Sequence, residues 1–208
     1  HPKTMPWKLA ESAIRIAAHN AAEQKAPFRL SFHGGDVGAC WDLFQKSLEF
    51  SKALCQQLGI QFSVSLGTNA VYPEDQAEYI ARNVSEATVS LDGLPEIHDL
   101  YRRRPDGSGT CAQILKSLKI FDAAGFQYSI RMTVLQDGLD RLPDSLEFIC
   151  KSCSAKQIWA EPLYLRGRAV EDTLRPPCPD QFVTQFRKAQ TVAEKYGRIL
   201  SYSGARIN

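Results

Sequence analysis

The sequence predicts an α/β protein in which a mostly parallel sheet is covered by helices. Strand-like and helix-like segments alternate about five times along the 208 residues, at a spacing of roughly thirty residues, the size of one strand–helix unit. Four of the strands alternate apolar and polar side chains, whereas parallel strands buried on both faces usually read as continuous apolar runs. We therefore expect one sheet face to pack on helices and the other to look into a hydrated or ligand-filled space, as in a partly open barrel.

The composition is that of an ordinary globular chain, with 44% apolar residues and a formal net charge of +2. Such a small charge does not require a nucleic-acid or membrane partner. No apolar run approaches the ~20 residues that a membrane helix needs, and the first residues lack the apolar stretch of a secretory signal. We therefore expect a cytoplasmic protein with neither kind of partner.

The first half of the chain predicts three strands and three helices. Apolar residues recur at helical spacing in some segments and alternate with polar residues in others. The second helix ends at Gly59, a residue type favoured just past a helix C-terminus, and the third opens at Pro73 with two acids, which suit a first turn. The predicted elements are the helices 9–22, 41–58 and 73–82 and the strands 28–33, 60–66 and 87–93.

The second half predicts three more strands and three more helices. A polar loop containing His98 and the basic run 102–104 is expected to be solvated. Thr110 and Gln113 have the spacing of a capping box at the start of the next helix. The predicted elements are the helices 111–124, 142–150 and 180–196 and the strands 126–134, 156–161 and 199–202.

The six cysteines suggest packing rather than a disulfide framework. Four of them, including Cys150, lie in amphipathic helical patterns, where free cysteine behaves as a small hydrophobe. Cys150 and Cys153 also have the spacing of a metal or redox pair, but a second pair is missing. A zinc or thiol-exchange role for these two residues is one alternative function.

The loops after the predicted strands carry the side chains that could bind a ligand, because strand C-termini form the ligand site of such barrels. In the first loop, Gly34 and Gly35 let the backbone approach a ligand closely, and Asp36 can accept hydrogen bonds from an ammonium group. The same stretch also reads as a plain turn closed by paired glycines.

Three further polar residues are candidates on the neighbouring strands. Arg131 lies on the polar face of a long alternating strand and could bind a carboxylate with two hydrogen bonds. Ser90 and Asn69 could bind hydroxyl groups or a base edge, although Asn69 also suits a left-handed turn. Together these groups suit a zwitterionic ligand rich in hydroxyls.

Taken together, these loops resemble the radical S-adenosylmethionine (SAM) enzymes, most of all the branch with SPASM or twitch auxiliary-cluster domains that includes the anaerobic sulfatase-maturating enzymes. The resemblance rests on Gly34-Gly35-Asp36, Thr68-Asn69, the segment 89–99 beginning Val-Ser-Leu-Asp-Gly, Arg102, Gly107-x-Gly109-Thr110, Glu161-Pro162-Leu163 and Gly167-Arg168-Ala169. It implies a partial (β/α)6 barrel, an open TIM-like barrel, here missing its first strand. Residues 1–175 would form an incomplete radical SAM core, and residues 176–208 a C-terminal helix and the start of a linker toward an auxiliary domain.

The resemblance also implies roles for individual residues. Gly34, Gly35 and Asp36 would hold the amino group of SAM, Ser90 would contact the ribose and Arg131 the carboxylate. Lesser contacts at the rim are implied for Asn69, Asp92, Arg102 and Leu163. Asp36 stands where the family usually has glutamate, so its reach is one methylene shorter, and the family's C-x3-C-x2-C cluster loop does not occur in this sequence.

The activity implied is that of an oxidoreductase-type maturase. A full-length enzyme would bind a 4Fe–4S cluster through three upstream cysteines and receive electrons from a donor such as flavodoxin or ferredoxin. It would cleave SAM to a 5′-deoxyadenosyl radical and modify a peptide or protein substrate. We expect the chain as given to be an inactive fragment. The alternative is a cluster-free TIM-like module that binds a nucleoside-type ligand or a peptide without catalysis.

Overall fold

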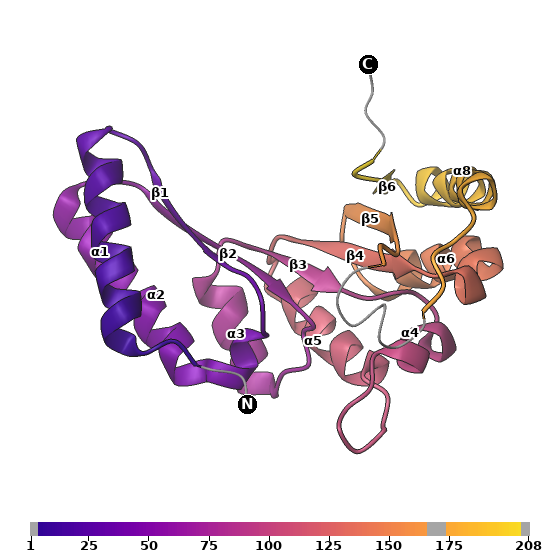
Figure 1. Cartoon of the computed structure of the whole chain (residues 1–208), viewed down its shortest axis with the longest axis horizontal. Helices are drawn as coiled ribbons and strands as arrows, with labels where there is room; N and C mark the ends of the chain where they lie inside the picture. Colours follow the sequence, from indigo (N-terminus) through magenta and orange to yellow (C-terminus); the bar gives the residue numbers. More distant parts are fainter. Residues whose placement is uncertain (1–3, 166–173, 205–208) are drawn as a thin grey trace.

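The computed structural model describes residues 4–165 and 174–204, whose strands form one six-stranded sheet in the order β1-β2-β3-β4-β5-β6 (Figure 1). Every neighbouring pair is parallel. The strands are β1 (Phe28–Phe32), β2 (Phe62–Thr68), β3 (Glu86–Ser90), β4 (Tyr128–Val134), β5 (Gln157–Pro162) and β6 (Ile199–Ser201). The predicted α/β class is confirmed, and the predicted strand limits differ from these by a few residues.

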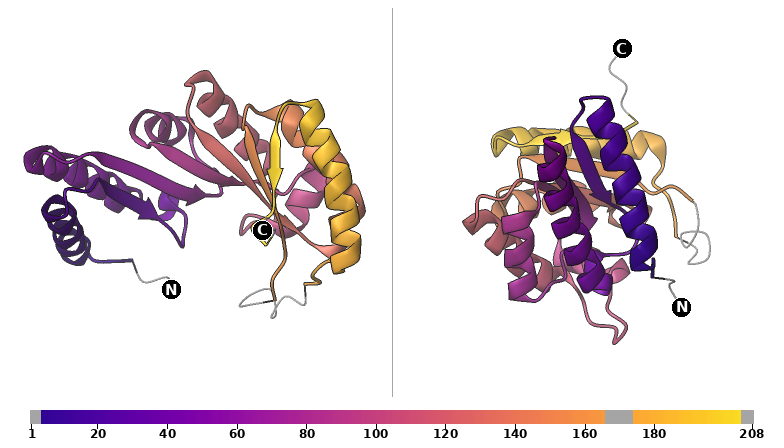
Figure 2. Two further views of the ribbon diagram at one scale, coloured as in Figure 1. Left: turned by 90° about the horizontal axis from the view of Figure 1, so that it is seen from above. Right: turned by 90° about the vertical axis from the view of Figure 1, so that its left-hand side faces the viewer.

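The helices lie on the outer side of a curved sheet and leave its other side open (Figure 2). The sheet ends at β1 and β6, so the barrel that it begins does not close within the described residues. This is the open, TIM-like arrangement that was expected. The helices are α1 (Trp7–Glu23), α2 (Trp41–Leu58), α3 (Glu74–Asn83), α4 (Pro95–Tyr101), α5 (Cys111–Ala123), α6 (Leu142–Ser152) and α8 (Pro179–Lys195), with short 3-10 segments η1 (Val37–Cys40) and η2 (Gln136–Arg141).

The two faces of the sheet differ as the strand pattern predicted. On the helix side, Val89, Ile130 and Ile158 are completely buried, and each such side chain contributes roughly 1.5–3 kcal/mol to stability. On the open side, hydroxyl groups pair across neighbouring strands. Ser31 lies 2.8 Å from Ser65, and Thr88 lies 3.1 Å from Ser129, measured between the side-chain oxygens. These hydroxyl groups form hydrogen bonds with one another, which allows the open face to be polar.

The segment between β3 and α5 was expected to be a solvated loop, and that expectation is wrong for its first part. Residues Pro95–Tyr101 form helix α4, which has proline at its start, where a missing N–H costs no hydrogen bond. His98 on this helix is completely buried. The signal in the sequence was the proline followed by an acid, the same pattern that correctly predicted α3.

The predicted capping box at α5 is also absent. Neither Thr110 nor Gln113 caps the helix through its side chain, because both side chains bond elsewhere. Instead, Oδ1 of Asp99 accepts hydrogen bonds from the backbone N–H groups of Thr110 and Cys111, at 2.7 and 2.9 Å. The cap thus comes from a neighbouring helix and satisfies two donors that a helix N-terminus leaves free.

No helix in residues 4–165 and 174–204 combines the length and the apolar character needed to span a lipid bilayer.

Candidate functional site

Ser90 and Arg131 form the centre of the polar open face. They are register partners on β3 and β4, so their backbones are about 4.8 Å apart. Both side chains line two cavities. One cavity, of about 340 Å³, extends to His33 and Thr68, and the other, of about 320 Å³, extends to Glu161. The structure thus brings together two candidate residues that are 41 positions apart in the sequence.

Arg131 is exposed on this face, and its guanidinium forms no ion pair or hydrogen bond with any residue that the structure describes. A guanidinium carries five N–H donors in a planar fork that matches a carboxylate. Arg131 is therefore the open-face group best suited to bind an anionic ligand group from the two cavities.

The loop after β1 leaves room for a ligand at its glycines. A Cβ built on Gly34 or Gly35 would have no neighbour within 4 Å, and Gly34 has a φ of +110°, a conformation that other residues rarely adopt. Next to them, Asp36 caps η1: its Oδ1 accepts a hydrogen bond from the N–H of Gly38 at 3.0 Å. The loop geometry therefore depends on Gly34 and Asp36, and at Gly35 the missing side chain leaves open space.

The carboxylate of Asp36 also ties this loop to the end of β2. Its Oδ2 accepts a hydrogen bond from the hydroxyl of Thr68 and another from the N–H of Asn69, both at 2.8 Å. Asp36 is half-buried and has three donors within its own protein. A ligand ammonium would add a fourth partner to a carboxylate that is already well oriented.

Asn69 and Leu163 lie at the rim of the open face. The side-chain oxygen of Asn69 accepts a hydrogen bond from the N–H of Val71 at 2.9 Å, which closes a tight turn, and the residue is exposed. Leu163 lines the 320 Å³ cavity, and its N–H donates to the carbonyl of Val134. Residue Ala70, rather than Asn69, has the left-handed φ of +52°.

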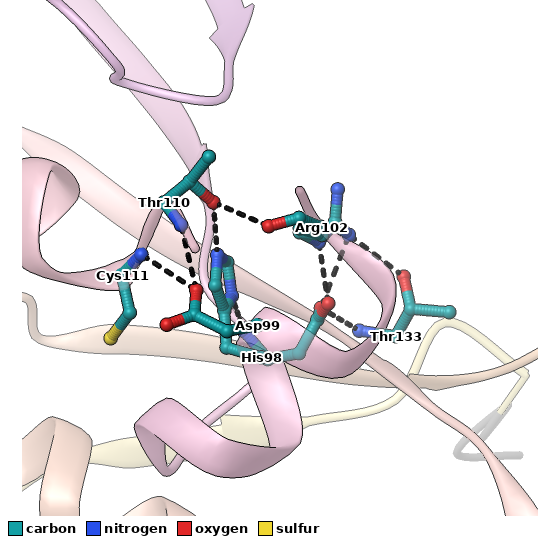
Figure 3. Close-up of polar contacts among 7 residues, drawn as sticks. His98, Asp99, Arg102, Thr110, Cys111 and Thr133 are labelled. Atoms are coloured by element: carbon teal, nitrogen blue, oxygen red, sulfur yellow. Dashed lines mark hydrogen bonds and ion pairs between the residues drawn. The ribbon is translucent and has the colours of Figure 1, made fainter. Parts of the chain in front are cut away.

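Asp92 and Arg102 form an ion pair, and Figure 3 shows the polar contacts that surround Arg102, with Thr133 on one side and His98 and Thr110 on the other. Asp92 is buried, and its Oδ1 also accepts a hydrogen bond from the N–H of Thr133 at 2.7 Å. Arg102 lines the 320 Å³ cavity, whereas Asp92 lines neither of the two cavities that Ser90 and Arg131 share. Of these two predicted rim contacts, Arg102 can face a ligand and Asp92 positions Arg102.

His98 is a further polar residue of this network, and sequence reasoning placed it in solvent. The N–H of Asp92 donates to its Nδ1 at 3.1 Å, so the ring proton lies on Nε2, which contacts the Thr110 hydroxyl at 3.0 Å. That hydroxyl in turn donates to the carbonyl of Arg102. Burial lowers the pKa of His98, against the opposing effect of the Asp92 and Asp99 carboxylates. The neutral ring thus holds the β3 loop against α4 and α5.

Cys150 and Cys153 are both buried free thiols, and burial raises the pKa of each. The Sγ of Cys153, the residue that follows α6, contacts the carbonyl of Ile149 in that helix, at 3.5 Å. Among the residues that the structure describes, no three or more His, Cys, Asp or Glu side chains are placed to hold a metal ion. Nothing in this region supports the zinc or thiol-exchange alternative.

The chain is similar to a cysteine-type anaerobic sulfatase-maturating enzyme of Clostridium novyi (strain NT), with 29% identity over 146 residues. The match covers 68% of this chain and 37% of the relative, so the chain spans little more than a third of that protein. No family model matches the sequence.

Two solved structures show the same fold. One is native anSMEcpe with bound AdoMet and a Kp18Cys peptide, with 19% identity and a TM-score of 0.74, covering 97% of this chain and 56% of that one. The other is coproporphyrinogen III oxidase (HemN) from Escherichia coli, a radical SAM enzyme, with 12% identity and a TM-score of 0.65, covering 93% of this chain and 48% of that one. The predicted resemblance to the radical SAM enzymes and the partial-barrel fold are confirmed.

Proposed function

We propose that this chain, which resembles the radical SAM enzymes in sequence and fold, binds SAM on the open face of its sheet and forms the barrel wall of a maturase. The observation that carries the proposal is the exposed guanidinium of Arg131. It has no partner in the described residues, stands beside its register partner Ser90, and lines two cavities of the open face, of which the 320 Å³ cavity lies at the C-terminal ends of β3, β4 and β5. Ligands of such barrels bind at these strand ends.

The chemistry of the open face fits the parts of SAM. Its carboxylate would accept two hydrogen bonds from Arg131, and a ribose hydroxyl would bond to Ser90. Its ammonium would lie at the loop of Gly34 and Gly35, with Asp36 as the nearby anion. The three groups come from the loop after β1, from β3 and from β4, and the 340 Å³ cavity is lined by Arg131 and by His33, the residue before Gly34.

The 320 Å³ cavity supplies space for a substrate beside the cofactor. It is bounded by Arg102, Glu161, Leu163 and Tyr164 and shares Ser90 and Arg131 with the first cavity. Because one structural neighbour holds a peptide together with AdoMet, we assign this space to a side chain of a peptide or protein substrate. A flavodoxin- or ferredoxin-type protein would be the electron donor of the complete enzyme.

The 4Fe–4S cluster of the family does not fit the residues that the structure describes, because they offer no set of three ligands for a metal. Such a cluster would supply the electron that cleaves the sulfonium, and no step of that cleavage is assigned to this chain. The proposal places the cluster ligands in sequence beyond these 208 residues. The chain alone is then expected to bind SAM without cleaving it.

Calorimetric titration of the chain with SAM tests the proposal. Arg131→Ala should weaken binding about 10- to 100-fold, since a hydrogen bond to a charged group contributes roughly 1.5–3 kcal/mol. Arg131→Lys should restore only part of the affinity, because lysine keeps the charge but loses the planar fork. The matched control is Arg187→Ala, an exposed arginine on α8 away from the open face. Equal affinities of the Arg131 and Arg187 variants would overturn the proposal.

The alternative is a cluster-free module that binds a nucleoside-type ligand or a peptide without catalysis. It is favoured by the lack of a metal-ligand set among the described residues. The two functions separate when the chain, extended by its native flanking sequence, is expressed without oxygen and reconstituted with iron and sulfide. Formation of 5′-deoxyadenosine from SAM supports the maturase, and a protein that binds SAM but forms neither cluster nor product supports the module.

A further inference from the structure

A short chain of hydroxyl groups lies directly behind the glycine loop. The hydroxyl of Tyr72 is 2.6 Å from Oγ1 of Thr68, which is 2.8 Å from Oδ2 of Asp36. Tyr72 is 1% exposed and Thr68 is 5% exposed, so water does not compete for these groups. The backbone N–H of Ala70 also donates to Oγ1 of Thr68, at 2.7 Å.

These contacts permit only one direction of hydrogen bonding. An ionised carboxylate can only accept hydrogen bonds. Asp36 therefore accepts the one hydrogen bond that the Thr68 hydroxyl can donate. Tyr72 and the N–H of Ala70 must then both donate to Oγ1 of Thr68, which uses both of its lone pairs. Burial raises the pKa of Tyr72, and the Asp36 carboxylate raises it further, so the phenol keeps the proton that it donates.

Tyr72 is itself held in place from two sides. The side chain of Gln113 on α5 donates to the carbonyl of Tyr72 at 2.6 Å, and the indole ring of Trp41 lies 6.4 Å from the Tyr72 ring, centre to centre. A Cβ on Gly38 would come within 3.1 Å of the same ring, so η1 packs closely on it. Tyr72 is therefore fixed in the core, and through Thr68 it holds the Asp36 carboxylate in position.

The contacts leave one acceptor position on the Asp36 carboxylate. Within residues 4–165 and 174–204, Oδ2 accepts hydrogen bonds from Thr68 and Asn69, and Oδ1 accepts one from Gly38 alone. A carboxylate oxygen can accept two hydrogen bonds, so Oδ1 can take one more donor. The other three bonds already fix the carboxylate. Binding of a ligand ammonium therefore loses little conformational entropy at this side chain.

We infer that Thr68 and Tyr72 are positioning residues for the amino-group end of SAM, which they orient through Asp36. This inference rests on the proposed function and deepens it. The bonds from Thr68 and Asn69 fix the Asp36 side chain against the end of β2. The effect should be specific to ligands that carry the amino acid part of SAM.

Two ligands separate this role from a general effect on the fold. S-adenosylhomocysteine carries the ammonium and carboxylate, and 5′-methylthioadenosine lacks both. Thr68→Val removes a hydrogen bond to a charged group and should lower the affinity for S-adenosylhomocysteine about tenfold. The affinity for 5′-methylthioadenosine should change less than about twofold. Tyr72→Phe should give a smaller loss of the same kind, and Thr68→Ser should restore most of the affinity. Thr191→Val is the control, because its hydroxyl bonds only to a carbonyl in its own helix α8.

Binding is measured by calorimetry on variants whose thermal unfolding confirms that they are folded. If Thr68→Val lowers the affinity for both ligands equally, or for neither, the inference is overturned while the proposed function stands. A wild-type chain that binds neither ligand overturns the proposed function and the inference with it. The N–H groups of Gly38 and Asn69 donate to the Asp36 carboxylate, so their hydrogen exchange should be faster in Thr68→Val than in Thr68→Ser. Equal exchange rates in the two variants would show that Thr68 does not hold the carboxylate in place.

Discussion

The carboxylate of Asp92 is held by two of the three side-chain nitrogens of Arg102, with Nε 2.5 Å from Oδ2 and Nη2 3.1 Å from Oδ1. The Asp92 side chain is 6% exposed and that of Arg102 is 32% exposed. Nη2 of Arg102 also lies 3.3 Å from the hydroxyl of Thr133 on β4. The pair therefore joins the end of β3 to α4 and β4, directly behind the open-face cavity that Arg102 lines.

Removing Arg102 should destabilise the fold, because it leaves the buried carboxylate of Asp92 without its charge partner. Arg102→Ala is expected to lower the free energy of unfolding by about 3 kcal/mol, the low end of the range for broken buried pairs, since Arg102 is partly exposed. The measurement is urea unfolding. The control, Arg103→Ala, removes an exposed arginine whose Nε bonds to a carbonyl and should cost less than about 1 kcal/mol. Equal losses in the two variants would contradict the assigned role.

His98 should make stability depend on pH below neutrality. The pKa of His98 in the folded chain is below the ordinary value of about 6.5, so the unfolded chain takes up the proton first as the pH falls. The contribution of His98 to the free energy of unfolding is complete above pH ~6.5. It decreases as the pH falls below that value toward the pKa of His98 in the folded chain. Urea unfolding at several pH values between 8 and 5 measures this loss.

The matched variants are His98→Gln and His19→Gln. Replacing His98 should flatten the pH dependence while lowering stability at pH 8, because the N–H of Asp92 and the hydroxyl of Thr110 lose their partner. His19 is exposed on α1, so its replacement should leave the pH dependence intact. A pH dependence that survives in His98→Gln would show that another group causes it.

Two glycines with positive φ should respond differently to alanine. Gly93 has a φ of +121°, and a Cβ there would lie 2.2 Å from Cβ of Ser145. Gly107 has a φ of +83° and open space around it. Both changes cost about 1–2 kcal/mol of backbone strain, and Gly93→Ala adds roughly 1–3 kcal/mol of overpacking. Thermal and urea unfolding of the two variants measure the difference, and equal losses would mean that Ser145 moves aside freely.

Thiol labelling should distinguish the cysteines by burial. Cys178 is exposed and should react first at pH 7.5, followed by the half-buried Cys40. The other four are buried and have raised pKa values, about 11 for Cys111, so little thiolate is present: Cys55, Cys111, Cys150 and Cys153. Mass spectrometry after brief labelling identifies the modified residues. Rapid labelling of Cys150 or Cys153 would contradict their burial.

The same two cysteines should not affect metal content. Cys150→Ala and Cys153→Ala are expected to leave bound zinc, measured by plasma emission spectrometry, at the level of the wild-type chain, because neither thiol belongs to a cluster of metal ligands in the described residues. Zinc that is bound by the wild type and lost from either variant would revive the zinc alternative.

The sequence by itself determined the six strands, every helix of ten residues or more that the structure describes, and which strand faces are polar, but it missed the short helix α4. These features depend on the spacing of side chains along a short stretch, so Ser90 and Arg131 could be placed on a polar face from local alternation alone. The resemblance of the loops to the radical SAM enzymes was also readable, because it rests on contiguous motifs. What these motifs could not show is which partner each polar side chain has.

Only the tertiary structure decided the roles of Asp36, Asp92 and His98. Asp36 is held by Thr68 and Asn69, more than thirty residues further along the chain, because β1 and β2 end side by side. His98 and Asp92 are buried together because α4 folds back under β3, and burial makes each polar group require a partner. Hydrogen-bond partners brought together by chain packing carry no local sequence period, which is the physical reason that the sequence placed the residues but not their contacts.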